Sequence, residues 1–166
     1  MLHLFFSHGK YSHPNSTKIA FLNKIAQEFG ITTKSMDYTH TTNPEERVEL
    51  LRKEIALVEE QPLILVGSSM GGYVSTVLAS EKAVEGLFLM APAFYLEGYA
   101  QQQFQPQTAH IEIVHGWKDA TVPFEQSVLF GEKHAAQLHL VEDNHRLSGS
   151  HELLKELFRA FLRRIV

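Results

Sequence analysis

The stretch PLILVGSSMGGYVSTVLAS, residues 62–80, decides the fold predicted for this chain. It begins with an apolar run over residues 62–66, passes through a turn rich in glycine and serine, and continues as a helical segment. A short apolar run that leads into a turn and a helix is typical of a strand buried on both faces of a parallel sheet. The turn has the pattern Gly67-x-Ser69-x-Gly71, with a serine at its apex.

Similar alternation extends over the rest of the chain. Further strands are predicted at residues 2–7, 31–38, 86–90, 110–114 and 137–141. Ser16 can cap a helix that stops at Gly30, and Asn43 can cap a second helix, with Glu46 placed to close a capping box. An amphipathic helix is expected from Ser150 onward. Six strands interleaved with helices predict the α/β class, as a three-layer αβα domain over residues 1–166 with a mostly parallel six-stranded sheet.

Composition excludes several classes of function. The chain has 166 residues, 44% of them hydrophobic, which suits one globular domain. A net charge of −4 favours neither nucleic acid nor an anionic membrane as a partner. Because there is no cysteine, disulfides and a thiol nucleophile are impossible. No apolar run is long enough to span a bilayer, and the N-terminal residues lack a basic leader, so we expect a cytoplasmic protein.

A serine nucleophile needs a histidine base, which in turn needs a carboxylate to orient it. The chain contains three aspartates, and Asp119 lies just after the strand predicted to end near His115. Of the ten histidines, His145 follows the last predicted strand directly, whereas His151 falls at the start of the final helix. Carboxyl ends of parallel strands share one edge of the sheet, so Ser69, Asp119 and His145 are expected to meet there.

The ordered Ser69, Asp119 and His145, together with the segments 67–71, 115–123 and 144–147, resemble the α/β-hydrolase superfamily, whose triad follows this order. The resemblance covers nearly the whole chain and is strongest for small esterase-like members. Two departures are expected. The antiparallel hairpin that commonly opens the family's sheet is missing, and so is the large cap. Residues 94–108 are predicted to form a loop or a short lid.

The resemblance also implies an oxyanion hole and a substrate site. The backbone N–H of Met70 is expected to provide one oxyanion donor, and that of Lys10, in the family's His-Gly-x loop, the other. Substrate contacts are expected from residues near the rim, namely His8, Gly9, Tyr11, Tyr73 and Trp117.

The predicted function is therefore a serine hydrolase that cleaves small acyl esters through an acyl-enzyme, with a small-molecule acyl substrate and no metal or organic cofactor. Aminopeptidase or thioesterase activity on the same triad remains an alternative, as does a non-catalytic binding protein that keeps the fold. A phosphate loop is excluded, because Tyr73 stands where its lysine would be. The sequence leaves the oligomeric state open.

Overall fold

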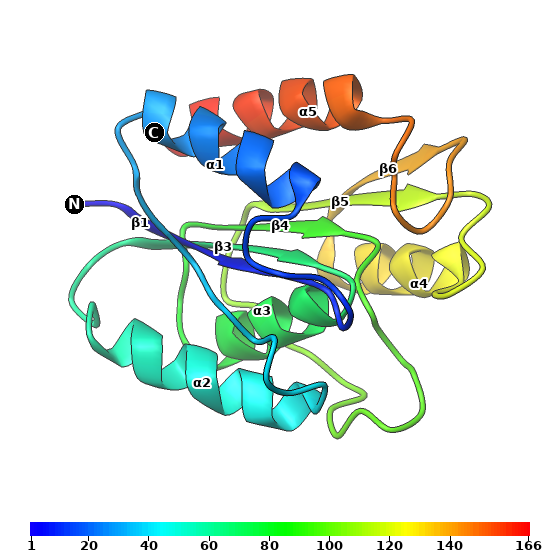
Figure 1. Ribbon diagram of the computed structural model, residues 1–166, viewed down its shortest axis with the longest axis horizontal. Coiled ribbons are helices and arrows are strands. Elements are labelled where there is room, and N and C mark those ends of the chain that lie inside the picture. The colour runs from blue at the N-terminus through cyan, green and yellow to red at the C-terminus, as the bar shows by residue number, and fades with distance from the viewer.

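The computed structural model describes residues 1–166 and contains one six-stranded sheet (Figure 1). The strands are β1 (His3–Ser7), β2 (Thr32–Ser35), β3 (Leu63–Ser68), β4 (Gly86–Met90), β5 (Ile111–Gly116) and β6 (Gln137–Val141). They lie in the order β2-β1-β3-β4-β5-β6, and every neighbouring pair is parallel. The predicted α/β class and six strands are confirmed, and the sheet is entirely rather than mostly parallel.

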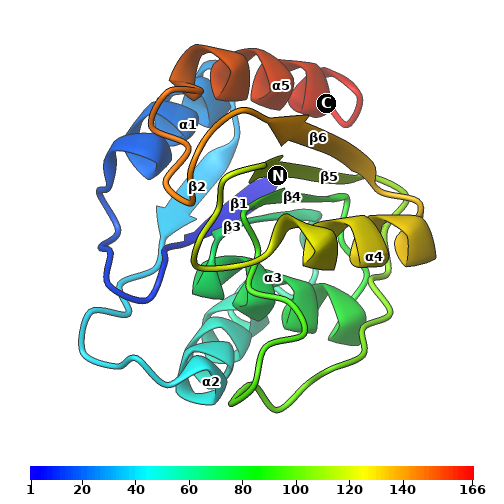
Figure 2. The same cartoon turned by 90° about the vertical axis from the view of Figure 1, so that its right-hand side faces the viewer.

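Five helices cover the two faces of this sheet. Helices α1 (Thr17–Glu28) and α5 (His151–Arg163) lie together on one face. Helices α2 (Pro44–Ala56), α3 (Met70–Glu81) and α4 (Phe124–His134) lie on the other, as Figures 1 and 2 show. The sheet separates two apolar cores, one of 23 buried residues beneath α2, α3 and α4 and one of 17 beneath α1 and α5. The result is the predicted three-layer arrangement.

Strand periodicity explains how one strand serves both cores. Along β3, Leu63 and Leu65 pack into the core beneath α2 and α3, while Ile64 and Val66 pack into the core beneath α1 and α5. Successive side chains of a strand point to opposite faces, so a strand covered on both sides must be apolar throughout. The edge strand β2 pairs only with β1 and is shorter than predicted, since it covers Thr32–Ser35 rather than residues 31–38.

The helix starts follow the sequence signals in part. Asn43 caps α2, and its side-chain oxygen accepts hydrogen bonds from the backbone N–H groups of Glu45 and Glu46. The expected capping box does not form, because the Glu46 carboxylate accepts instead from the Thr41 hydroxyl. Ser16 stands at the N-cap of α1, but its side chain makes no capping hydrogen bond.

No helix connects β4 to β5. The residues in between form the predicted loop, whose Phe94 and Phe104 are buried in the core beneath α3 and α4. Its far end is fixed where the Gln107 N–H donates to the carbonyl of Ala79, at 2.8 Å. This connection contains no cap domain.

The carboxyl ends of all six strands meet at one edge of the sheet, which faces the viewer in Figure 2. The loops after β1, β3, β5 and β6 gather at that edge, and they contain the residues singled out from the sequence. None of the five helices combines the length and the apolar character needed to cross a membrane.

Candidate active site

Ser69 lies at a sharp turn between β3 and α3. Its backbone has φ 53° and ψ −117°, a conformation that residues other than glycine rarely adopt. Backbone hydrogen bonds to neighbouring segments stabilise this strained conformation. The Ser69 N–H donates to the Met90 carbonyl at 2.9 Å, and the Ser69 carbonyl accepts from the N–H groups of Gly72 and Ala93, both at 2.9 Å. The turn presents the Ser69 hydroxyl at the carboxyl edge of the sheet.

The two flanking glycines are required by close backbone contacts. A Cβ atom at Gly67 would lie 2.2 Å from the carbonyl oxygen of Gly71. A Cβ atom at Gly71 would lie 1.9 Å from the carbonyl oxygen of Ser7, the last residue of β1. The Gly67-x-Ser69-x-Gly71 pattern therefore lets strand, helix and neighbouring strand approach closely around Ser69.

Ser69, His145 and Asp119 form a continuous hydrogen-bonded chain. The Nε2 atom of His145 lies 2.9 Å from the Ser69 hydroxyl oxygen. The Nδ1 atom of the same ring lies 2.6 Å from Oδ2 of Asp119. The Asp119 side chain is completely buried, whereas that of His145 is 22% exposed. The structure thus brings together three residues that are far apart in the sequence.

The Asp119 carboxylate is surrounded by donors. Its Oδ1 atom accepts from the backbone N–H groups of Thr121 and Val122, at 2.8 and 2.7 Å. Its Oδ2 atom lies 3.1 Å from Nε2 of His115 in addition to the contact with His145. Burial alone raises the pKa of Asp119, but the hydrogen bonds from the two histidines and the two N–H groups outweigh it and lower the pKa well below its usual range. Asp119 is an anion at neutral pH.

The loop that holds His145 is fixed on both sides. The Asp143 carboxylate accepts from the N–H groups of Asn144 and Gly149, at 2.7 and 2.9 Å. Lys18 of α1 donates from Nζ to the carbonyl of Arg146 at 3.0 Å. Burial, with a smaller effect of the Arg146 charge, lowers the pKa of Lys18 to about 8. Leu147 has φ 55° and is buried in the core beneath α1 and α5. The position of the imidazole is therefore set by a rigid loop.

The loop after β1 lies against Ser69. A Cβ atom at Gly9 would lie 3.6 Å from the Cβ atom of Ser69. The backbone N–H groups of Lys10 and Met70 donate no hydrogen bond within the protein. Met70 is the first residue of α3, so no carbonyl one turn earlier can accept its N–H. Two free donors thus belong to segments that flank the serine.

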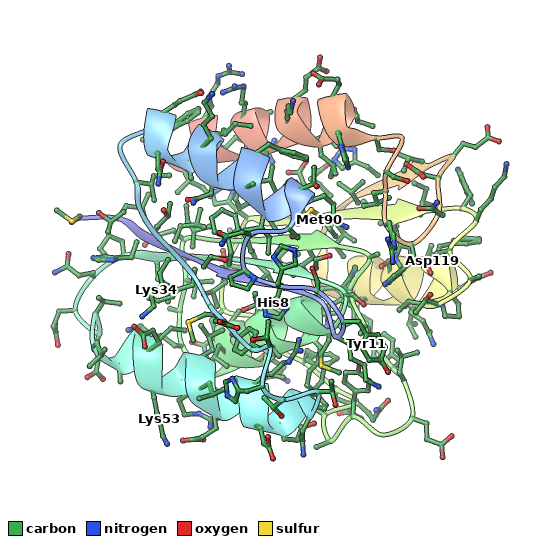
Figure 3. The ribbon with its side chains drawn as sticks, viewed as in Figure 1. His8, Tyr11, Lys34, Lys53, Met90 and Asp119 are labelled. Atoms are coloured by element: carbon green, nitrogen blue, oxygen red, sulfur yellow. The ribbon has the colours of Figure 1, made fainter.

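The residues predicted to contact substrate occupy different environments. Tyr11 is 87% exposed and Trp117 is 50% exposed, and Figure 3 shows Tyr11 on the same side of the molecule as Asp119. His8 and Tyr73 are fully buried. The His8 Nε2 atom accepts from the Tyr38 N–H, and the Tyr73 hydroxyl donates to the Glu45 carboxylate. The structure therefore does not place the side chains of His8 and Tyr73 at the rim, because buried Tyr38 and partly buried Glu45 engage them.

Two residues near the site were not singled out from the sequence as functional. His115 lies in β5, and its Nδ1 atom is 2.6 Å from the Ser127 hydroxyl while its Nε2 atom donates to the Val122 carbonyl at 2.9 Å. Its spacing four residues before Asp119 was the available signal. Arg47 lies in the first turn of α2 and is fully buried. No local pattern marks it, because most of its partners lie in loops distant in the sequence. No group of three or more His, Asp or Glu side chains could hold a metal ion.

An all-parallel αβα sheet with a serine at the strained β3–α3 turn, hydrogen-bonded to a histidine and an aspartate from later strand ends, defines an α/β-hydrolase-like protein. Within that class, residues 3–121 match the model of the uncharacterised protein family UPF0227, and the chain belongs to this family. The matched region contains Ser69 and Asp119 but ends before His145. A comparison with curated protein sequences finds no match.

Solved structures support the same fold. A protein of the alpha/beta hydrolase superfamily from Xanthomonas campestris pv. campestris is 26% identical, with a TM-score of 0.84 over 98% of each chain. Est1E from Butyrivibrio proteoclasticus, solved with ferulic acid bound, is 17% identical, with a TM-score of 0.84 over 99% of this chain and 89% of its own. A serine hydrolase without a lid, also from Xanthomonas campestris, is 18% identical, with a TM-score of 0.78 over 98% and 81% of the two chains. The last two likenesses concern the fold alone.

Proposed function

We propose that this chain is a serine hydrolase that cleaves small acyl esters through a covalent acyl-enzyme. The hydrogen-bonded chain from the Ser69 hydroxyl through His145 to the buried Asp119 carboxylate carries the proposal. A serine hydroxyl is a weak nucleophile at neutral pH, and an adjacent imidazole with an oriented tautomer makes it reactive. The buried anion at Asp119 fixes the proton of His145 on Nδ1 and leaves Nε2 free to accept the serine proton.

The reaction begins when the Ser69 oxygen attacks the acyl carbonyl and its proton passes to Nε2 of His145. The carbonyl oxygen becomes an oxyanion, which accepts hydrogen bonds from the free N–H groups of Lys10 and Met70. Collapse of this intermediate breaks the bond to the leaving alcohol, which takes the proton from His145. Water then attacks the acyl-enzyme, with His145 again accepting a proton, and the acid is released with Ser69 restored.

The surroundings of the triad support a small substrate. The connection from β4 to β5 has no helix and packs into the core at Phe94 and Phe104, so no cap domain encloses the strand ends. The partly exposed His145 and Trp117 are consistent with a shallow site open to solvent. An open site suits a short acyl group better than a long chain, which needs an enclosed apolar channel.

A fluorophosphonate probe tests the nucleophile directly. The wild-type protein is expected to be labelled on Ser69 and to hydrolyse short p-nitrophenyl esters, whereas Ser69→Ala is expected to lose labelling and about 10⁴-fold or more of the turnover. Ser68→Ala is the matched control, because His145 hydrogen-bonds to Ser69 and not to this neighbouring serine, and it should still be labelled. Turnover that survives in Ser69→Ala, or a wild-type protein that resists the probe, would refute the proposal.

A substrate panel tests the preference for esters. Acetyl and butyryl p-nitrophenyl esters, the matching thioesters and aminoacyl p-nitroanilides should be compared by kcat/KM, with Ser69→Ala as the background. The highest kcat/KM is expected for the short esters. If the aminoacyl amides or the thioesters are the better substrates, the triad mechanism stands but the assignment to esters is wrong.

A further inference from the structure

Arg47 is a buried cation with no carboxylate partner. It lies in the first turn of α2, its side chain is fully buried, and it forms no ion pair. All of its hydrogen bonds go to backbone carbonyl oxygens. They run from Nε to Thr41 at 2.9 Å, from Nη1 to His8 and Gly9 at 3.1 Å each, and from Nη2 to Lys10 and Tyr38 at 3.0 and 3.5 Å.

A charge in this position is costly to the fold. Removing a guanidinium from water without an opposite charge nearby costs on the order of several kcal/mol before hydrogen bonds compensate for it. The Tyr38 ring, 5.2 Å from the guanidinium carbon, and the carbonyl dipoles provide the compensation. Burial lowers the pKa of Arg47, but an arginine remains protonated at neutral pH. The charge and its N–H donors therefore lie directly against the loop that follows β1, beside Ser69.

Three of the carbonyls that Arg47 contacts belong to the loop beside Ser69. Among them, the Gly9 carbonyl, which belongs to the peptide between Gly9 and Lys10, accepts the most hydrogen bonds. The Gly9 carbonyl accepts from Arg47, from the Ser12 N–H at 3.2 Å and from His8 Nδ1 at 2.8 Å. His8 carries its proton on Nδ1, since its Nε2 accepts from the Tyr38 N–H. The carbonyl of this peptide is therefore anchored toward Arg47.

The same peptide contains the N–H of Lys10. The chain has no cis peptide bond, so the N–H points to the side opposite the Gly9 carbonyl, away from Arg47. That N–H has no acceptor within the protein, and the adjacent Gly9 lies next to Ser69. Hydrogen bonding of a cation to the carbonyl also draws electron density from the amide, which makes its N–H a stronger donor.

We propose that Arg47 is a positioning residue for the oxyanion hole, which aims and polarises the Lys10 N–H through the Gly9 carbonyl. The inference rests on the proposed hydrolase function. The charge of Arg47 lies behind the loop rather than in contact with substrate, so Arg47 acts on the transition state through the peptide bond between Gly9 and Lys10. The developing oxyanion is the group that benefits, because preorganised donors favour the transition state over the ground state.

The test compares Arg47→Met and Arg47→Lys with the same two changes at Arg52, a partly exposed arginine of α2 that pairs with Glu49 and Glu81. The substrates are p-nitrophenyl acetate and its thiono analogue, whose sulfur accepts hydrogen bonds only weakly. For Arg47→Met, kcat for the ester is expected to fall about 10- to 100-fold with little change in KM, while the thiono substrate loses clearly less. Arg47→Lys, which keeps the charge but not the fork, should fall in between, and the Arg52 variants should match the wild type.

The outcomes separate this inference from the proposed function. If the wild type and the Arg52 variants show no turnover and no probe labelling at Ser69, the hydrolase proposal itself fails. If they are active but the Arg47 variants lose the ester and thiono reactions by the same factor, or lose neither, the assignment of Arg47 to the oxyanion hole is overturned. Circular dichroism and the melting temperature monitor folding. An Arg47→Lys protein that cannot fold would show that the guanidinium serves the fold alone, which also overturns it.

Discussion

Substitution of Gly71 by alanine should disable the site without touching a reacting group. Gly71 is the second residue of α3, where an added Cβ would lie 1.9 Å from the Ser7 carbonyl oxygen and 2.8 Å from that of His8. Real Cβ contacts do not fall below 3.0 Å, so the two backbones must separate by at least 3.0 − 1.9 = 1.1 Å. Ser7 and His8 lead directly into the loop at Gly9, so the separation moves the Lys10 N–H relative to the serine.

A displacement of about 1 Å in a positioning element can cost about 100-fold in rate. We therefore expect kcat/KM of Gly71→Ala for p-nitrophenyl acetate to fall about 100-fold or more, and overpacking to reduce the free energy of unfolding by about 1–3 kcal/mol. Initial rates and urea unfolding followed by circular dichroism measure the two effects. The fold is expected to survive, since each face of the sheet has its own core.

Gly131→Ala is the matched control. This glycine also lies in a helix, α4, but the nearest atoms to its added Cβ would be 3.9 Å away, in ordinary contact. Replacing a helical glycine that has room for a methyl group stabilises a protein by about 0.4–1 kcal/mol, so this variant should keep its activity and gain stability. A Gly71→Ala protein with wild-type kcat/KM would refute the reasoning, because the structure allows that methyl group no space without movement of β1.

The remaining predictions concern Asp119 and its neighbours. In Asp119→Asn the NH₂ group must face either the N–H groups of Thr121 and Val122 or the N–H of His145, and neither can accept a hydrogen bond from it. We therefore expect kcat for p-nitrophenyl acetate to fall about 10⁴-fold, and a loss below tenfold would contradict the role assigned to the acid. Because the folded pKa of Asp119 is depressed, the ionised carboxylate stabilises the fold fully above about pH 5, and this stabilisation is lost as the pH falls below that value. The difference in unfolding free energy between wild type and Asp119→Asn, measured in urea, should therefore narrow from about pH 5 downward, and a constant difference would disprove this linkage. His115→Phe leaves the buried Ser127 hydroxyl and the Val122 carbonyl without this hydrogen-bond partner and should lower the free energy of unfolding by about 1–3 kcal/mol. Unchanged stability in urea would show that the two hydrogen bonds of His115 contribute little.

Much of the fold could be predicted from the sequence, because each strand and helix has a local signal. The strands at residues 86–90 and 137–141 have the predicted bounds, and the α2 cap at Asn43 is the predicted one. The capping-box prediction failed because a neighbouring side chain prevailed over the local pattern. Glu46 bonds to the Thr41 hydroxyl rather than closing the capping box. Strand β2 ends at Ser35, short of the predicted residue 38, although the other edge strand, β6, has its predicted bounds.

The candidate site divides in the same way. Chain order and residue type were enough to select Ser69, Asp119 and His145, since parallel strands bring their carboxyl ends to one edge. The burial of His8 and Tyr73 could not be predicted, because it depends on how Tyr38 and Glu45 pack against them. An amphipathic pattern shows that a side chain faces inward, but it does not show which distant groups it meets there.

The sequence by itself determined the alternation of strands and helices, the glycine-flanked serine and the order of its partners, because short-range periodicity and backbone sterics are written in neighbouring residues. Only the tertiary structure decided that His145 meets a hydroxyl 76 positions earlier in the chain, that His115 also contacts the acid, and that Arg47 holds the loop beside the serine from behind. Those contacts join segments remote in sequence, and their geometry is set by the packing of helices on both faces of the sheet.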